Sequence, residues 1–423
     1  MAELVVGIDI GTTKVCTIVG EVREDNTYIV GVGVEPTRGM KKGMVTDVNA
    51  LSASISSSVH KAERSSGYEI GRAFVSVSAK HVESMNSKGM VAINGQRAVE
   101  MRDIGSAMDA ARAIALPYGR EVLHVVPRRY NLDEQQSVRN PVGMHGYRLE
   151  VEAHVITAAS ASLENLNKCV EAAGVMVDRF ILNPLASGDV VLTNTERESG
   201  VMVVDIGGGT TDIAIFIEGT VWHTGVVAVG GYNITNDIAQ VMSLPYELAE
   251  AVKLEFGHAD TRVVTPLEMF PVQPFGEEHI SQVKRSDLVD IINARVSEIF
   301  ELVLVEVKRS GYDGLLPAGV VLTGGTSLLP GLKAVANRVM NMPARTAQPE
   351  AISGMADPLR SPAFSTSVGL LRLGLIMDME DDRRAKMRKR GAPSNSIDPL
   401  ANSLGKALGG IFKRFTPNLD EDN

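Results

Sequence analysis

The chain contains the stretch Val201-Met202-Val203-Val204-Asp205-Ile206-Gly207-Gly208-Gly209-Thr210-Thr211-Asp212 and, near its start, a near-copy, Leu4-Val5-Val6-Gly7-Ile8-Asp9-Ile10-Gly11-Thr12-Thr13. In each copy an apolar run of strand length ends in an aspartate, glycine and a pair of threonines follow, and a second apolar run comes next. This pattern predicts a buried strand, a tight glycine turn and a returning strand. Two copies in one chain suggest two similar lobes that close on one ligand.

The two turns have the chemistry of a phosphate site. Glycine lets backbone N–H groups approach a ligand closely, and threonine adds hydroxyl donors, so such a turn suits an anion. Asp9 and Asp205 are predicted to hold a hydrated Mg²⁺ beside the phosphates, because hard cations prefer oxygen ligands and keep their waters. A single Asp-Xaa-Gly turn is common hairpin punctuation, so the prediction depends on the repeat. The predicted phosphate-binding residues are Gly11, Thr12, Thr13, Lys14, Gly207, Gly208, Gly209, Thr210 and Thr211.

Three further features support a nucleotide cleft. A buried strand runs into Gly324-Gly325, where the missing side chains let a flat base or a phosphate lie against the backbone. Gly230-Gly231 is a second close-approach loop, with Asn233 as a donor in the helix that follows. Lys253, on a later helix, is a candidate for the ribose or the base. The alternatives are an ordinary strand-to-helix turn and a solvated helical lysine.

Composition limits the possible functions. The 423 residues, 44% of them hydrophobic, are enough for two or more domains. A net charge of −9 argues against a general nucleic-acid binder. Cys16 and Cys169, both in apolar runs, are expected to pack in a core in a reducing compartment. No secretory leader and no membrane-spanning run is expected, so the protein is predicted to be cytosolic or to lie on a membrane surface.

The order of strands and helices predicts an α/β protein of two lobes with an inserted α+β module and a C-terminal amphipathic helix. The first lobe is assigned to residues 1–73 and 159–200, and the module to residues 74–158. The second lobe is assigned to residues 201–234 and 316–377, the latter returning to the first lobe, with an outer subdomain at residues 235–315. A linker at residues 378–396 precedes the amphipathic helix, residues 397–416.

This order of motifs resembles the superfamily of actin, DnaK-type chaperones and sugar kinases, and within it the FtsA family of bacterial cell-division proteins. The likeness covers the whole chain. The hairpins at Asp9 and Asp205 and the turn Thr323-Gly324-Gly325…Pro330-Gly331 carry the superfamily signal, and the insert and the tail carry the family signal. The resemblance implies an actin-like fold that binds ATP and Mg²⁺ between its lobes and assembles with other copies of itself.

The resemblance also implies partners. The outer subdomain of the second lobe would hold the C-terminal tail of the tubulin-like protein FtsZ, and the inserted module would recruit later division proteins. Arg285 and Arg295, on the long helix of the outer subdomain, are candidates to receive acidic groups of that tail by charge-assisted hydrogen bonds. The alternative is that both arginines are merely solvated. The chain would then tether FtsZ filaments to the cytoplasmic face of the inner membrane at the division site.

The tail itself has the pattern of a membrane-binding helix. At 100° per residue its large apolar side chains fall within one arc of about 120°, which suits the interface of an anionic membrane. The alternative is a helix docked on its own protein, which the preceding charged linker disfavours. The predicted membrane residues are the apolar Leu400, Leu404, Leu408, Ile411, Phe412 and Phe415 and the basic Lys406, Lys413 and Arg414.

Hydrolysis is expected to be slow. Several bacterial relatives of the superfamily place a glutamate before the proline of the turn that matches Asn183-Pro184 here. Asn183 cannot act as a general base, although its amide could orient a water. Two competing interpretations remain. A small-molecule kinase of the same fold would need a substrate base and no membrane helix, and the related type IV pilus assembly protein would lack the tail.

Overall fold

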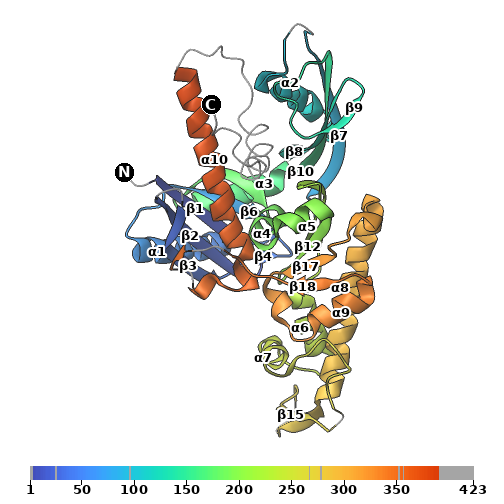
Figure 1. The fold of residues 1–423 in the computed structure, drawn as a ribbon. Helices are drawn as coiled ribbons and strands as arrows, with labels where there is room; N and C mark the ends of the chain where they lie inside the picture. Colours follow the sequence, from blue (N-terminus) through green and yellow to red (C-terminus); the bar gives the residue numbers. More distant parts are fainter. Residues whose placement is uncertain are drawn as a thin grey trace.

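The computed structural model describes residues 3–389 apart from 24–25, 95–96, 266, 277–278, 351–352 and 356. Two lobes lie side by side, each built on a mixed sheet (Figure 1). The strand order is β11-β6-β1-β2-β3-β19 in the first lobe and β14-β13-β12-β17-β18 in the second. In both sheets three antiparallel strands are continued by two parallel ones. The repeat predicted from the sequence is therefore a repeat of topology.

The first lobe places its helices on the two faces of its sheet. Its strands are β1 (Glu3–Ile10), β2 (Lys14–Arg23), β3 (Asn26–Pro36), β6 (Arg72–Val77), β11 (Met176–Leu182) and the short β19 (Ser353–Gly354). A small hairpin joins β3 to the first helix and is formed by β4 (Met40–Lys41) and β5 (Met44–Val45). The helices are α1 (Val48–Ser66), α3 (Ser160–Glu171), α4 (Asn183–Val191) and α5 (Asn194–Ser199).

The second lobe carries the outer helices and a short two-stranded sheet. Its central strands are β12 (Val201–Ile206), β13 (Thr211–Ile217), β14 (Thr220–Val227), β17 (Val320–Thr323) and β18 (Ala344–Thr346). The outer elements are α6 (Gly231–Val241), α7 (Tyr246–Phe256), β15 (Met269–Val272), β16 (Ser281–Lys284) and α8 (Arg285–Ser310). The helix α9 (Leu332–Met340) follows β17.

Both cysteines of the chain, Cys16 and Cys169, are buried as free thiols in the core of the first lobe, as predicted.

The inserted module has its own sheet and its own hydrophobic core. It contains β7 (Glu83–Ala92), α2 (Met101–Arg112), β8 (Arg120–Leu132), β9 (Gln135–Val138) and β10 (Arg148–Ala159). Ile104, Met108 and Ala111 form the buried face of α2, as their spacing predicts. The predicted start of the module at residue 74 is wrong, because β6 pairs with β1 and β11 in the first-lobe sheet.

Cation–π and hydrogen-bond contacts fasten the module to the second lobe. The Arg128 guanidinium lies 4.2 Å from the Trp222 ring centroid, and that of Arg129 lies 4.6 Å from it. Trp222 belongs to β14 and meets Tyr312 edge to face at 5.5 Å. The ring of His154 is hydrogen-bonded to Thr224 at 3.0 Å. The module therefore contacts both lobes, through its chain connections to the first and through side chains to the second.

A long helix, α10 (Ser365–Lys389), returns the chain to the first lobe and packs along α4 and β1. The prediction that a linker begins at residue 378 is wrong, because the helix continues to Lys389. Acidic and basic residues, which suggest a solvated linker by charge, are also good helix formers. The predicted amphipathic helix, residues 397–416, lies outside the described residues.

Two buried histidines make the fold acid-sensitive. His124 accepts a hydrogen bond from the Leu182 backbone N–H at 3.0 Å, and burial together with nearby Arg179 lowers its pKa to about 3. Burial likewise holds the pKa of His154 well below its usual value. In the unfolded chain a histidine binds a proton below about pH 6.5, whereas in the folded protein His124 stays neutral down to about pH 3. Stability is therefore lost as the pH falls from about 6.5 toward 3.

We expect the unfolding free energy of the protein to fall by about 2 kcal/mol on account of His124 alone between pH 7 and pH 5. Urea titrations at the two pH values measure the drop. The drop is expected to be smaller in His124→Gln than in the wild type. His60→Gln, at an exposed position on α1, is expected to show the same drop as the wild type. Equal drops in all three proteins would contradict the assignment.

Candidate functional site

The two repeated hairpins have the same turn geometry. In the first, the Gly11 N–H donates to the Lys14 carbonyl at 3.0 Å, and in the second the Gly207 N–H donates to the Thr210 carbonyl at 2.9 Å. Register pairs Ile10 with Val15 in the first lobe and Ile206 with Thr211 in the second. The predicted strand, glycine turn and returning strand are confirmed in both copies.

The threonine pairs of the two copies are not structurally equivalent. The registers align the hairpins without a gap, so Thr12 and Thr13 correspond to Gly208 and Gly209. The two tips meet across the junction of the lobes: a Cβ on Gly208 would lie 2.2 Å from Thr13 Oγ1, and one on Gly209 2.6 Å from Thr12 Oγ1. The threonines of one hairpin thus fit against the glycines of the other. Tyr232 strengthens the contact by donating its hydroxyl to the Thr12 carbonyl at 3.3 Å.

The remaining predicted glycines surround the second hairpin. The Gly231 N–H donates to the Gly207 carbonyl at 2.9 Å, and a Cβ on Gly230 would come within 2.6 Å of the same oxygen. Gly324 has a left-handed backbone (φ 85°), and a Cβ there would lie 2.3 Å from Asp205 Oδ1. Gly325 faces more open space. A side chain at Gly230 or Gly324 would collide with atoms of the second hairpin, so these glycines allow the segments around it to pack closely.

Two adjacent hydroxyl residues at the start of α10 hold the two predicted magnesium ligands. Ser367 donates to Asp9 at 2.8 Å, and Thr366 donates to Asp205 at 2.9 Å. Both aspartates are buried, and burial raises the pKa of Asp205 to about 6. One helix end therefore contacts the central strands of both lobes, a link that no sequence pattern predicted.

Asp212 is a third carboxylate at the junction. It is the last residue of the repeated motif, but no role was predicted for it. It accepts from Ser78 of the first lobe at 2.7 Å and from Thr210 at 3.1 Å. Its Oδ1 atom is buried without a hydrogen-bond partner among the described residues. Burial, with Asp205 nearby, holds the pKa of this carboxyl well above its usual range. A carboxylate inside an otherwise apolar strand was the signal that could have identified it.

Three side chains that were predicted to contact the nucleotide form hydrogen bonds or ion pairs within the protein. Lys14 donates to the Ala363 carbonyl at 2.6 Å and lies 4.7 Å from the Phe364 ring centroid. Lys253 pairs with Glu250 at 2.7 Å. Asn233 accepts from the Gly230 N–H at 3.1 Å and so caps α6. Their predicted roles toward phosphate, ribose or base would require these contacts to be exchanged.

The candidate arginines of the outer subdomain are also paired. Arg285 meets Glu268 at 2.6 Å and donates to the Phe256 carbonyl, while Arg295 forms a two-pronged pair with Asp237 at 2.5 and 2.8 Å. Neither is merely solvated. Asn183 begins α4 after β11, and its Oδ1 atom is buried without a partner among the described residues.

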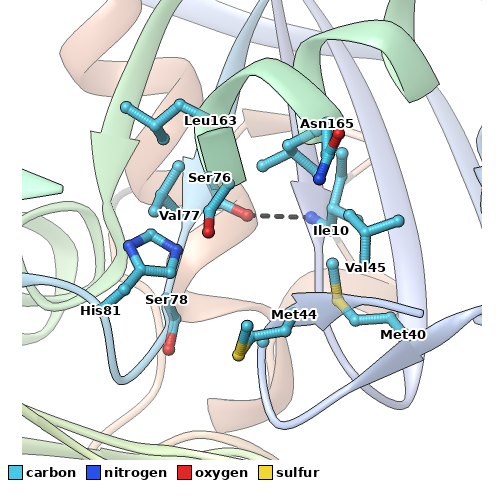
Figure 2. A pocket seen from close by; sticks show the side chains of 13 residues that line it. Ile10, Met40, Met44, Val45, Ser76, Val77, Ser78, His81, Leu163 and Asn165 are labelled. Atoms are coloured by element: carbon cyan, nitrogen blue, oxygen red, sulfur yellow. Dashed lines mark hydrogen bonds between the residues drawn. The ribbon is translucent and has the colours of Figure 1, made fainter. Parts of the chain in front are cut away.

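A pocket of about 50 Å³ lies beside the first hairpin (Figure 2). Its walls come from the β4–β5 hairpin, from β6 and from α3. Figure 2 shows Met40 and Met44 on one side and Leu163 and Asn165 on the other. Ser76, between them, accepts the Ile10 N–H at 2.9 Å and donates to Asp9 at 2.9 Å. The pocket therefore adjoins Ser76, which positions Asp9, the first of the two predicted magnesium ligands.

Two lobes of one topology, joined at paired glycine hairpins that each follow an aspartate, define an actin-like protein. The solved structure of a PilM-PilN type IV pilus biogenesis complex aligns with a TM-score of 0.64 and 18% identity, over 88% of this chain and 98% of that one. MreB5 of Spiroplasma citri, solved with ADP, aligns with a TM-score of 0.50 and 13% identity, over 92% of this chain and 99% of its own. These likenesses show the fold.

The family follows from closer relatives. The model of "Cell division protein FtsA" matches residues 202–369, and that of the "SHS2 domain inserted in FTSA" matches residues 79–157. Cell division protein FtsA of Pseudomonas aeruginosa is 43% identical over 403 residues, covering 95% of this chain and 96% of the relative. The chain belongs to the FtsA family and is a cell division protein. Within the described residues, no helix is long and apolar enough to cross a membrane.

Proposed function

We propose that this protein is a nucleotide-switched tether of the division machinery. It binds ATP with Mg²⁺ between its lobes, holds the C-terminal tail of FtsZ on its outer subdomain, assembles with other copies of itself and recruits later division proteins through the inserted module. Residues 397–416 bind anionic lipids on the cytoplasmic face of the inner membrane at the division site. The observation that carries the switch is the contact between the two hairpin tips, Thr12-Thr13 against Gly208-Gly209.

The residues at the junction fit a magnesium nucleotide. Two glycine turns of the kind that suits an anion meet there, and Gly325, beside the second hairpin, has its nearest neighbour only at ordinary van der Waals distance. Asp9 and Asp205 would hold the ion through water, and the buried Oδ1 atom of Asp212 still has an acceptor to offer. When bound, Mg²⁺ supplies positive charge against the phosphates. The protein's own groups orient the anion and exclude water.

A nucleotide would set the angle between the lobes. A phosphate group placed between the tips must separate them, because Thr13 and Gly208 are already in contact. Thr366 and Ser367 carry that change into α10, since each is bonded to the aspartate of a different lobe. Hinge closure around a ligand is a common switching device. The proposed states are one that favours assembly and one that does not.

We expect tight binding of Mg·ATP with a turnover below about one per minute, against roughly 10 per second for a median enzyme. The absence of a general base at Asn183 is the reason. Phosphate release and fluorescent-nucleotide titration, with and without lipid, measure the two quantities. Many turnovers per minute would remove the switch interpretation.

The glycine cradle can be tested separately. Gly231→Val would place a side chain within 2.5 Å of Thr326 Oγ1 and is expected to abolish nucleotide binding. Gly71→Val is the matched control, because its Cβ would meet no atom within 4 Å. Thermal melts of both variants separate lost binding from lost folding.

FtsZ binding on this surface would be an exchange of partners. The acidic tail would replace Glu268 at Arg285, or Asp237 at Arg295, so that a charge-assisted bond is made for each one broken. Such an exchange gives selectivity with modest affinity, because little net electrostatic energy is gained. This suits a tether that holds a dynamic filament.

A further inference from the structure

The nucleotide site has more negative than positive side chains directed at it. Asp9, Asp205 and Asp212 meet at the junction of the lobes, whereas Lys14 and Lys253 are engaged with Ala363 and Glu250. A triphosphate entering this site would add its negative charge to that of the Asp9 and Asp205 carboxylates, and one Mg²⁺ balances only part of the combined charge. A further cation near the hairpin tips would favour its binding.

The turn of the β4–β5 hairpin places a lysine at this position. Gly43 lies so close to β6 that a Cβ would come within 1.7 Å of the Ser78 carbonyl, and the Ser78 hydroxyl bonds both Thr210 and Asp212. On the other side of the turn, the Lys42 Cα lies 3.1 Å from where a Cβ of Gly209 would stand. Lys42 therefore sits where the tips of the two nucleotide hairpins meet.

The backbone of Lys42 is unusual for its residue type. Lys42 and Gly43 both have positive φ, 51° and 75°, as in a type I′ turn. Asparagine, aspartate and glycine are the residues that favour this conformation, and lysine does not. A residue kept in a disfavoured conformation beside a site is an indication of function.

We propose that Lys42 is a phosphate-binding residue that the β4–β5 turn brings to the nucleotide. The inference rests on the proposed nucleotide site. Lys42 is exposed, and among the described residues its ammonium makes no ion pair or hydrogen bond. A lysine stem places its charge roughly 6 Å from the Cα, which spans the width of the Gly209 turn. The ligand class is a nucleoside di- or triphosphate, because the cation is beside the phosphate end and not the base.

The test compares nucleotides of different phosphate number on the purified full chain with Mg²⁺. Lys42→Gly is expected to weaken ATP binding roughly ten-fold or more, to leave AMP binding within about two-fold, and to melt at or above the wild-type temperature. Lys42→Arg keeps the charge and is expected to retain most of the affinity. Lys41→Ala is the matched control, since this exposed lysine lies one residue earlier in β4.

The outcomes are distinguishable. Lower ATP affinity without lower melting temperature in Lys42→Gly supports the assignment, because a purely structural lysine would not give that combination. Wild-type affinity in Lys42→Gly, or an equal loss in Lys41→Ala, would overturn the role of Lys42 and leave the nucleotide site standing. Failure of the wild type to bind ATP would remove the site itself, and with it the role of this lysine.

Discussion

Removing residues 390–423 is expected to abolish sedimentation of the protein with anionic vesicles. The truncation ends where the described helix α10 ends, at Lys389, so the lobes and the module stay intact. The removed stretch contains the apolar arc from Leu400 to Phe415 and four basic residues, Arg390, Lys406, Lys413 and Arg414, and each basic residue near an anionic surface contributes about 1 kcal/mol. The full chain should pellet with vesicles and the truncated chain should stay in the supernatant.

The control retains the tail and changes only its charge. Lys406→Glu, Lys413→Glu and Arg414→Glu together are expected to reduce pelleting sharply with anionic vesicles, while leaving α10 untouched. Added FtsZ should pellet only with the full chain. Equal pelleting of the full and truncated chains would remove the tether interpretation.

Replacing Asp189 by alanine is expected to lower the unfolding free energy by about 3–5 kcal/mol. Asp189 lies on α4 and pairs with Arg197 of α5 at 3.4 Å and with Arg372 of α10 at 3.1 Å. Arg197 is almost fully buried and also donates to the carbonyls of Gly188 and Asp189. Without the carboxylate, its charge would remain buried and unpaired. Urea denaturation at pH 7 measures the loss.

Two comparisons test whether the buried charge is the cause. Glu198→Ala breaks the exposed pair with Arg139 and is expected to cost less than about 1 kcal/mol. The double variant Asp189→Leu with Arg197→Leu removes both charges and is expected to recover most of the stability. A loss below about 1 kcal/mol for Asp189→Ala would contradict the assignment. Because α4, α5 and α10 connect the lobes, such a loss would also loosen the hinge.

Local patterns in the sequence predicted the elements well. The sequence pattern predicts helices over Tyr246–Phe256 and about Arg285–Ser310, and α7 and α8 have these bounds, since Pro245 precedes the first and a glycine follows each. The paired hairpins, the lobes and the module were also predicted, because each depends on periodicity and turn residues that are close in the chain. The short β9 was missed, since four residues carry too little periodicity.

The parts of the site that the sequence did not predict depend on distant contacts. The two threonine pairs look equivalent in the sequence but are offset by two positions in the structure, because only strand register shows that Thr13 faces Gly208. No sequence pattern distinguished Thr366 and Ser367, which donate to aspartates more than 150 positions away in the chain. Lys14 was predicted to contact a phosphate, but its ammonium donates to the carbonyl of Ala363, 349 positions away in the chain.

The helix α10 has a mechanical consequence for the membrane. Its 25 residues span roughly 37 Å at 1.5 Å per residue. Its first turn is bonded to both aspartates, and its far end leads to the residues proposed to enter the lipid. A rotation of about 10° at its base would displace the far end by roughly 6 Å over that length. The helix would act as a lever arm that amplifies a small change at the phosphates into a larger displacement at the bilayer.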